Sequence, residues 1–200
     1  MGNYAGNITI PSKITIEAVD YNVTSIGYSA FKNCTDLTTI TIPESVTSIA
    51  SYAFYNCSGI TYLEIPRNVS EIGDYAFRGC SNLRYAVVPK GVNVINVGVF
   101  QECTNLNQVV LPNGITRIKD WAFHQSGITS ITIPEGITSL GNSTFANCNK
   151  LQTITLPESL VSMDEYAVYG CKNLSKVVCS AKTPPSYTGE PFYYYSASLY

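Results

Sequence analysis

The chain has 200 residues and a formal net charge of −2, from 12 Lys and Arg against 14 Asp and Glu. Charged residues make up only 13% of the sequence and form no basic run, which argues against a nucleic-acid partner. No segment approaches the roughly 18 apolar residues of a transmembrane helix, and the N-terminal MGNYAG lacks the apolar stretch of a signal peptide.

Residues 1–39 are expected to form an N-terminal cap and a first coil, with an insertion at 12–22. Pro11 and Val23 are twelve residues apart, whereas the equivalent pair in the next unit is three apart. Within the insertion, apolar residues alternate with polar ones, as on one face of a strand, at Ile14, Ile16 and Ala18. We therefore predict a β-type cap that covers the first coil, because terminal repeats must protect an open edge.

Residues 40–176 form six repeats of about 23 residues, of which 40–62 reads ITIPESVTSIASYAFYNCSGITY. Six of the seven cysteines occupy one position of this repeat, namely Cys34, Cys57, Cys80, Cys103, Cys148 and Cys171. Their spacing is 23, except that Cys103 and Cys148 lie 45 apart. A period of about 20–29 residues with recurring Leu and Ile positions predicts a leucine-rich repeat solenoid. The chain, 1–200, is therefore expected to be a single elongated domain.

Each repeat begins with two alternating apolar residues and a proline, here Ile40, Ile42 and Pro43. The alternation predicts a short strand, which the proline ends because it has no backbone N–H to donate. Val46 and Ile49 predict a second, irregular edge, and the Ala-Phe pair at Phe54 suits a short helical turn. Asn or Gly usually precedes the cysteine and predicts a turn, with Glu102 as a strained exception. The expected fold is a right-handed coil with a short parallel β-sheet.

The repeated cysteines are expected to be free, buried thiols that act as small hydrophobes. Stacked coils bring equivalent Cα atoms to about 4.8 Å, inside the disulfide range, but side chains in register point in parallel and keep their Cβ atoms apart. An odd total of seven also leaves one cysteine unpaired. With no C-x-x-C and a single histidine, the sequence predicts no zinc site.

One unit, 109–130, has 22 residues and lacks the cysteine. Its segment from Trp121 to Ser126 contains the only Trp and the only His of the chain. Two interpretations stay open. Either one residue is deleted at a coil corner, with Ser126 in place of the cysteine, or this unit is a local binding feature.

Residues 177–200 are expected to form a partial coil followed by a Tyr-rich tail. Val177 to Cys179 begin another strand, and the Thr-Pro-Pro at 183–185 breaks the repeat. The aromatic run at 192–195 fits a cap or a hinge. Because the last residues, 198–200, read as the start of a strand, we expect a truncated fragment of a longer protein.

The unit I-T-I-P-x-x-V-T-S-I-x-x-x-A-F-x-x-C-x-x-L resembles the bacterial Treponema-type, or BspA-like, leucine-rich repeat over about residues 8–182. The match is specific because the proline, Ala-Phe and cysteine positions recur together. The resemblance implies a secreted or cell-surface-anchored, extracellular protein. It implies adhesion to host matrix proteins, host cells or other bacteria, and it transfers no catalytic residue.

The strand residues that face away from the core are the first candidates for a binding site. They are mostly Thr and Ser near the two ends of the stack, whereas the centre holds Tyr62, Glu64, Tyr85, Val87, Gln108 and Val110. An exposed aromatic and aliphatic cluster on a polar solenoid is typical of an interface. Ordinary cross-strand packing of strand-forming residues is the alternative interpretation.

A second candidate column precedes the Ala-Phe pair and consists of Tyr52, Tyr75, Trp121 and Tyr166. Aromatic rings at this position could stack on sugar rings or on proline. The alternative is half-buried packing over the turn.

The sequence favours a non-catalytic binding module over an enzyme. With a single histidine, no G-x-S-x-G and no phosphate-binding loop, we expect no catalytic residue, no metal and no cofactor. The expected partner is a host extracellular-matrix or cell-surface protein, or a glycan, bound through one face of the solenoid. The alternative function is a structural spacer that displays another domain of a longer surface protein.

Overall fold

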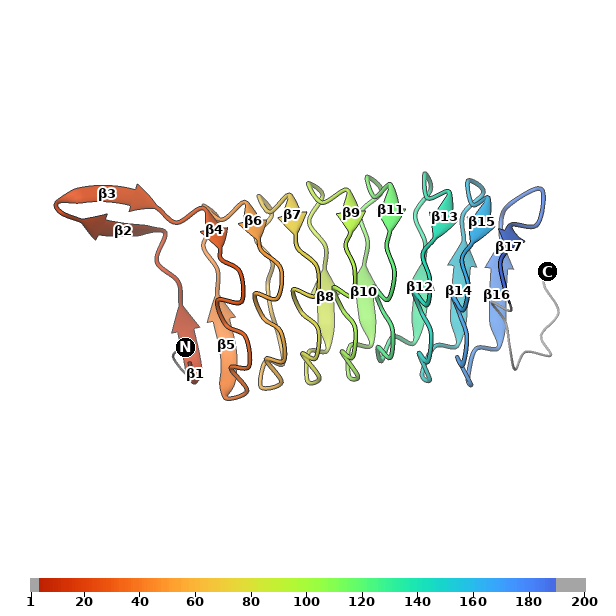
Figure 1. Cartoon of the computed structure of the whole chain (residues 1–200), viewed down its shortest axis with the longest axis horizontal. Coiled ribbons are helices and arrows are strands. Elements are labelled where there is room, and N and C mark those ends of the chain that lie inside the picture. Colours follow the sequence, from red (N-terminus) through yellow and green to blue (C-terminus); the bar gives the residue numbers. More distant parts are fainter. Residues whose placement is uncertain (1–3, 190–200) are drawn as a thin grey trace.

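The computed structural model describes residues 4–189, and the predicted leucine-rich repeat solenoid is confirmed. Its coils stack along one axis into an elongated rod (Figure 1). The first strands of successive coils lie along one side of the rod as β1 (Gly6–Thr9), β5 (Leu37–Thr41), β8 (Tyr85–Val87), β10 (Gln108–Val110), β12 (Ser130–Thr132), β14 (Thr153–Leu156) and β16 (Lys176–Cys179). They pair in parallel as β1 with β5, β8 with β10, and β12-β14-β16.

The second edge of the coil is more regular than the sequence predicted. Two-residue strands form there, namely β4 (Ser25–Ile26), β6 (Ser48–Ile49), β7 (Glu71–Ile72), β9 (Val94–Ile95), β11 (Arg117–Ile118), β13 (Ser139–Leu140), β15 (Ser162–Met163) and β17 (Ser186–Tyr187). They pair in parallel as β4-β6-β7 and as β9-β11-β13-β15-β17. Each strand buries its apolar second residue from Ile26 to Met163, so this edge also closes the core.

The core is one continuous apolar column that runs the length of the stack. At its centre six phenylalanine rings stack face to face, with centroids 5.2–5.6 Å apart, from Phe31 through Phe54, Phe77, Phe100, Phe123 and Phe145. The Tyr4 ring lies 5.1 Å from the Phe31 ring and closes the N-terminal end of this column. No coil could bury its phenylalanine alone, so stacking supplies the stability of each unit.

The predicted short helical turns are wrong, because no helix forms within residues 4–189. The two positions of the Ala-Phe pair instead lie between two left-handed residues in every coil, as at Tyr52 (φ 60°) and Asn56 (φ 57°) around Phe54. Glu102, expected to be strained, has the same conformation, with φ 60°. This backbone directs the N–H of Phe54 to the carbonyl of Ala76 in the next coil, at 2.8 Å. The turn is therefore a third ladder between coils.

The repeated cysteines are buried and unpaired. From the second coil onward each Sγ donates to the phenylalanine carbonyl of the preceding coil, at 2.9 Å for Cys57 to Phe31 and 3.2 Å for Cys80 to Phe54. The same bond recurs at Cys103, Cys148 and Cys171. The position therefore selects a small side chain that can both fill the core and donate one hydrogen bond.

The insertion forms the predicted β-excursion, as an antiparallel hairpin of β2 (Lys13–Ile16) and β3 (Val19–Asn22). Its position differs from the expectation. The hairpin extends past β1, away from the stack (Figure 1), and all eight strand residues are exposed, so it does not lie across the first coil. The predictions for the aromatic run at 192–195 and the last strand at 198–200 fall outside the described residues.

The 22-residue unit contains the deletion at a coil corner that was one of the two interpretations. Ser126 takes the cysteine position, is buried, and lies with Oγ 3.3 Å from the Sγ of Cys148. One residue is missing between Ser126 and Ile128, and β10 does not pair with β12 on the adjacent side. Lys150 reaches across this shortened coil and donates from Nζ to the carbonyl of Thr104 at 3.0 Å.

Candidate functional site

The row of first strands lacks one strand in the N-terminal half of the solenoid (Figure 1). Residues 62–65 carry the same Leu-x-Ile pattern as the other units, and Leu63 and Ile65 are buried, but no strand forms there. Within residues 4–189, no backbone N–H or C=O of these four residues has a hydrogen-bond partner. Because such groups are strongly polar, they must bind water or a ligand. The gap lies between β5 and β8.

Two hollows flank this unpaired segment. The larger has a volume of about 810 Å³ and is lined by Tyr62, Glu64, Tyr85, Val87, Asn68 and Lys90, among others. The smaller, of about 260 Å³, lies toward β5 and also contacts Tyr62 and Glu64. Tyr62 is 56% exposed and Val87 44% exposed, although both are large and apolar. Tyr62 and Glu64 therefore form a ridge between two depressions.

The larger hollow, called the groove from here on, is surrounded by charges of both signs that nearly balance. Arg67 Nε lies 3.5 Å from Glu44 Oε2, in an exposed ion pair of the kind that contributes little to stability. Glu64 and Lys90 add one further charge of each sign. A partner for this surface is therefore selected by shape, apolar contact and hydrogen bonding more than by long-range attraction.

The structure brings together four of the six predicted strand-face residues. Tyr62, Glu64, Tyr85 and Val87 line the larger hollow. Gln108 and Val110 lie beside it, paired with Tyr85 and Val87 across the β8–β10 ladder. Sequence reasoning missed Glu44, Arg67, Asn68 and Lys90, which complete the rim. The available signal was their place just after the proline that ends each first strand.

The second predicted column is not one surface. The rings of Tyr52 and Tyr75 stack at 5.2 Å, but Gly98 holds the same position in the next coil and Ser143 holds it two coils further on. Trp121, 40% exposed, is separated from Tyr75 by the Gly98 coil, and Tyr166 is separated from Trp121 by the Ser143 coil. The structure therefore brings only Tyr52 and Tyr75 into contact.

A polar cluster lies beside the turn ladder. Arg78 Nη2 donates to Glu102 Oε1 at 2.8 Å, and the amide of Asn147 lies 3.5 Å from Nε2 of His124. Partial burial lowers the pKa of His124, opposed by the charge of Glu102 and assisted by that of Arg78. His124 Nδ1 is buried without a partner in the described part of the chain.

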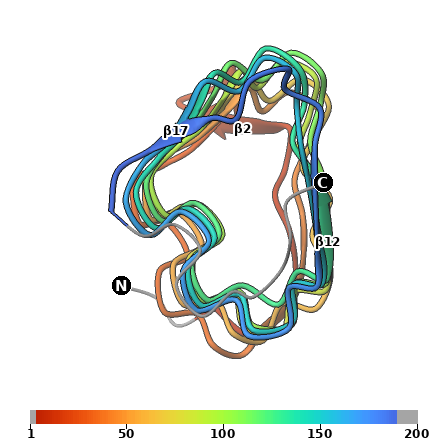
Figure 2. The same ribbon diagram turned by 90° about the vertical axis from the view of Figure 1, so that its right-hand side faces the viewer.

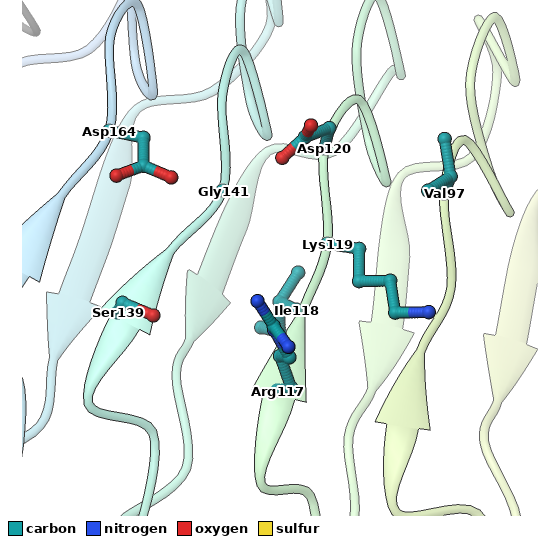
Figure 3. Close-up of a pocket in the computed structure, with 8 residues that line it drawn as sticks. All are labelled: Val97, Arg117, Ile118, Lys119, Asp120, Ser139, Gly141 and Asp164. Atoms are coloured by element: carbon teal, nitrogen blue, oxygen red, sulfur yellow. The ribbon is translucent and has the colours of Figure 1, made fainter.

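A smaller hollow of about 180 Å³ opens on the side of the two-residue strands (Figure 3). Gly141 is one of its lining residues, at a position that leaves no room for a side chain. A Cβ there would lie 2.5 Å from Oδ1 of Asp120 and 2.7 Å from its backbone N. Asp120 is already engaged, since its Oδ1 accepts the N–H of Asn142 at 2.9 Å. Asp120 therefore has a structural role in the turn, and Gly141 is required by the close approach.

In residues 4–189 no helix is long and apolar enough to cross a membrane. The described residues also contain no cluster of three or more His, Cys, Asp or Glu side chains placed to hold a metal ion.

Comparison with known proteins points to a single family. The model described as "BspA type Leucine rich repeat region (6 copies)" matches residues 7–129 and 122–199. No protein of curated function matches the chain.

Solved structures show the same architecture. A leucine-rich cell surface protein of Faecalibacterium prausnitzii is 25% identical, with a TM-score of 0.61, over 88% of this chain and 70% of that one. The Treponema pallidum leucine-rich repeat protein is 22% identical, with a TM-score of 0.67, over 93% and 74%. The pneumococcal vaccine antigen PcpA is 16% identical, with a TM-score of 0.56, over 88% and 61%.

Proposed function

Because the chain belongs to the BspA-type leucine-rich repeat family, we propose that it is a non-catalytic, adhesin-like module that binds a host matrix or cell-surface protein through its first-strand face. The observation that carries this proposal is the groove at the interrupted ladder. Exposed Tyr62 and Val87 stand there beside backbone groups without a protein partner. The rest of that row is dominated by Thr and Ser.

The chemistry of the groove suits a protein partner. Tyr62 and Tyr85 offer large contact areas at low entropic cost, which is typical of residues that dominate binding energy. Glu64, Asn68 and the unpaired backbone of 62–65 offer hydrogen bonds around them. The ridge-and-hollow shape favours a convex loop or side chain of the partner over a flat surface.

We place the protein at the cell surface or outside the cell. Support comes from the family and from the F. prausnitzii neighbour, which is described as a cell surface protein. The continuous core from Ile26 to Val177 supports treating the chain as one binding domain.

A solid-phase screen against extracellular-matrix proteins and mucin tests the proposal, with a Tyr62→Ala/Tyr85→Ala double variant alongside. The matched control is Tyr187→Ala, which removes a tyrosine that is 61% exposed at the far end of the stack. Saturable binding that survives Tyr187→Ala and is lost in the double variant supports the proposal. Binding that the double variant retains would remove the groove from consideration.

A structural spacer is the second candidate, and the elongated, continuously packed rod favours it (Figure 1). A spacer would bind no partner in the screen, and every exposed substitution would be silent. Absence of saturable binding across the panel would therefore favour this function over the adhesin.

A further inference from the structure

Six side chains form a cation–tyrosine array on the first three coils. The array consists of Tyr28, Lys32, Tyr52, Tyr55, Tyr75 and Arg78. All but Tyr28 lie directly beside the Ala-Phe pair of their coil, and Tyr28 lies two residues before Ala30. Viewed along the stack, the coil outline folds inward between its second strand and the next first strand (Figure 2).

Each of the two cations of the array lies over two tyrosine rings. Lys32 Nζ lies 5.5 Å from the Tyr52 ring and 5.2 Å from the Tyr55 ring. Arg78 Cζ lies 5.4 Å from the same Tyr55 ring and 5.9 Å from the Tyr75 ring. Both cations therefore contact Tyr55, and two positive charges concentrate on one aromatic surface.

The array holds hydrogen-bond donors that the protein does not use. Lys32 Nζ has no acceptor and no carboxylate partner among the described residues. Arg78 donates from Nη2 to Glu102, but its Nε is buried and has no hydrogen-bond partner among the described residues. Asp74, another carboxylate on these coils, accepts the N–H of Val97 at 3.1 Å. The charge of Lys32 is therefore uncompensated.

The turn itself does not need aromatic residues at these positions. Tyr52 and Tyr75 have φ of 60° and 57°, a region that bulky side chains rarely adopt. Gly98 takes the same position in the next coil with φ 58°, and its N–H still bonds to the following coil at 3.0 Å. A Cβ at Gly98 would overlap the Tyr75 ring, so this glycine leaves the space into which that ring leans.

We propose that the cation–tyrosine array binds an acidic saccharide, a pyranose ring that carries a carboxylate. The weakly positive C–H face of a pyranose matches the negative face of a tyrosine ring. The carboxylate would accept from Lys32, which lies over the Tyr52 ring. Tyr28 contacts the same Tyr52 ring at 5.7 Å, is 70% exposed and supplies an open wall. This site is separate from the first-strand groove and does not depend on that groove binding a protein.

Titration calorimetry of the chain with three sugars tests the assignment, namely 3′-sialyllactose, a hyaluronan tetrasaccharide and neutral lactose. The first two distinguish a sialic acid from a uronic acid source, and lactose reports stacking without charge. We expect millimolar binding of at least one acidic sugar and none of lactose. Lys32→Gln should weaken that binding about tenfold, through loss of one charge-assisted hydrogen bond, and Tyr28→Ala should also weaken it.

Two matched controls separate this site from other effects. Lys13→Gln removes an exposed lysine on the hairpin, and Tyr62→Ala removes the exposed tyrosine of the groove, so neither should change sugar binding. Circular dichroism would show that each variant is folded. Failure of the first-strand proposal would appear in the protein screen, as binding that the Tyr62→Ala/Tyr85→Ala variant retains, whereas failure of this proposal would appear in the sugar titrations.

Several outcomes would overturn the assignment. One is that neither acidic sugar binds at millimolar concentration, and another is that lactose binds as well as they do. Equal affinity in Lys32→Gln would place the sugar elsewhere. A hexaglutamate peptide serves as a fourth probe, and its binding in place of the sugars would assign the array to an acidic polypeptide.

Discussion

The side-chain amide of Asn96 donates to the carbonyl of Ile72 at 2.7 Å, where other coils use a backbone N–H. The equivalent bonds are Gly73 N to Ile49 O at 2.8 Å and Lys119 N to Ile95 O at 2.9 Å. An Asn amide can compete with the main chain for a ladder carbonyl. This difference coincides with the break between β7 and β9, which lies at the same coil boundary as the gap between residues 62–65 and β8.

Asn96→Ala should destabilise the protein by about 1–3 kcal/mol, because the Ile72 carbonyl loses its donor. Urea unfolding followed by far-ultraviolet circular dichroism measures this change. Asn93→Ala is the matched control, since Asn93 is exposed and its side chain makes no hydrogen bond in the described structure. Unchanged stability of Asn96→Ala would show that the backbone N–H of residue 96 takes over the carbonyl.

The unpaired segment 62–65 should exchange its amide hydrogens faster than an equivalent strand. The comparison is β14, whose residues 153–156 pair with β12 on one side and β16 on the other. Amides without a partner have no local barrier to exchange, whereas those of β14 need an opening event. Hydrogen–deuterium exchange by mass spectrometry resolves both peptides. Equal protection of the two would mean that the ladder is continuous in solution.

Phe77→Ala should destabilise the protein by about 3–5 kcal/mol, as core aromatic truncations do. Phe77 is fully buried and stacks on Phe54 at 5.5 Å and on Phe100 at 5.6 Å. Phe77→Leu, which keeps more of the side-chain volume, should lose less. Urea unfolding of the two variants is the measurement, and an alanine variant as stable as the parent protein would contradict the stacked core.

The buried thiols should be inert until the protein unfolds. Burial raises the pKa of Cys57 to about 12 and that of Cys80 well above its ordinary value, so neither forms the reactive thiolate at neutral pH. A thiol reagent at pH 8 should modify only the half-buried Cys179 in the native protein and all seven cysteines in denaturant. Rapid native modification of several cysteines would contradict the packing.

The raised pKa of Cys57 makes the free energy of unfolding depend on pH. In the unfolded chain a thiol ionises near pH 9, whereas Cys57 stays neutral in the folded chain up to about pH 12. The unfolded state therefore loses protons first, and the contribution of this thiol to stability is present below pH 9 and declines above it. Melting temperatures measured from pH 7 to pH 11 should fall at the alkaline end, and Cys57→Ser should reduce that fall.

The fold could be predicted from the sequence because its period is carried by many positions at once. The proline, the Ala-Phe pair and the cysteine each recur, so the strand row and the core follow from any one of them. The helical turn was wrong because small and apolar pairs such as Ala53 and Phe54 suit several backbones. Gly98 and Ser143 hold the position that an aromatic residue takes in other coils, and the glycine there was the available signal for a left-handed backbone.

The site was less predictable, for two physical reasons. Leu63, Ile65 and Pro66 follow the strand pattern, so nothing local distinguishes the coil in which no first strand forms. Lys32 and Arg78 contribute to the array only because coil stacking brings them over Tyr55. The Tyr-rich centre of the first-strand face was visible in the sequence because a strand places alternate residues on one surface.

The affinity of the Tyr62→Ala/Tyr85→Ala double variant for a partner found in the screen, compared with that of the Tyr187→Ala control, is the most direct measurement. Both changed groove residues are outside the fully buried core, so unfolding transitions should stay close to that of the parent protein. We expect the double variant to lose about 100-fold or more in affinity, in line with two central aromatic contacts, while the control binds normally. A folded double variant that binds as tightly as the parent protein would show that the groove is not the binding surface.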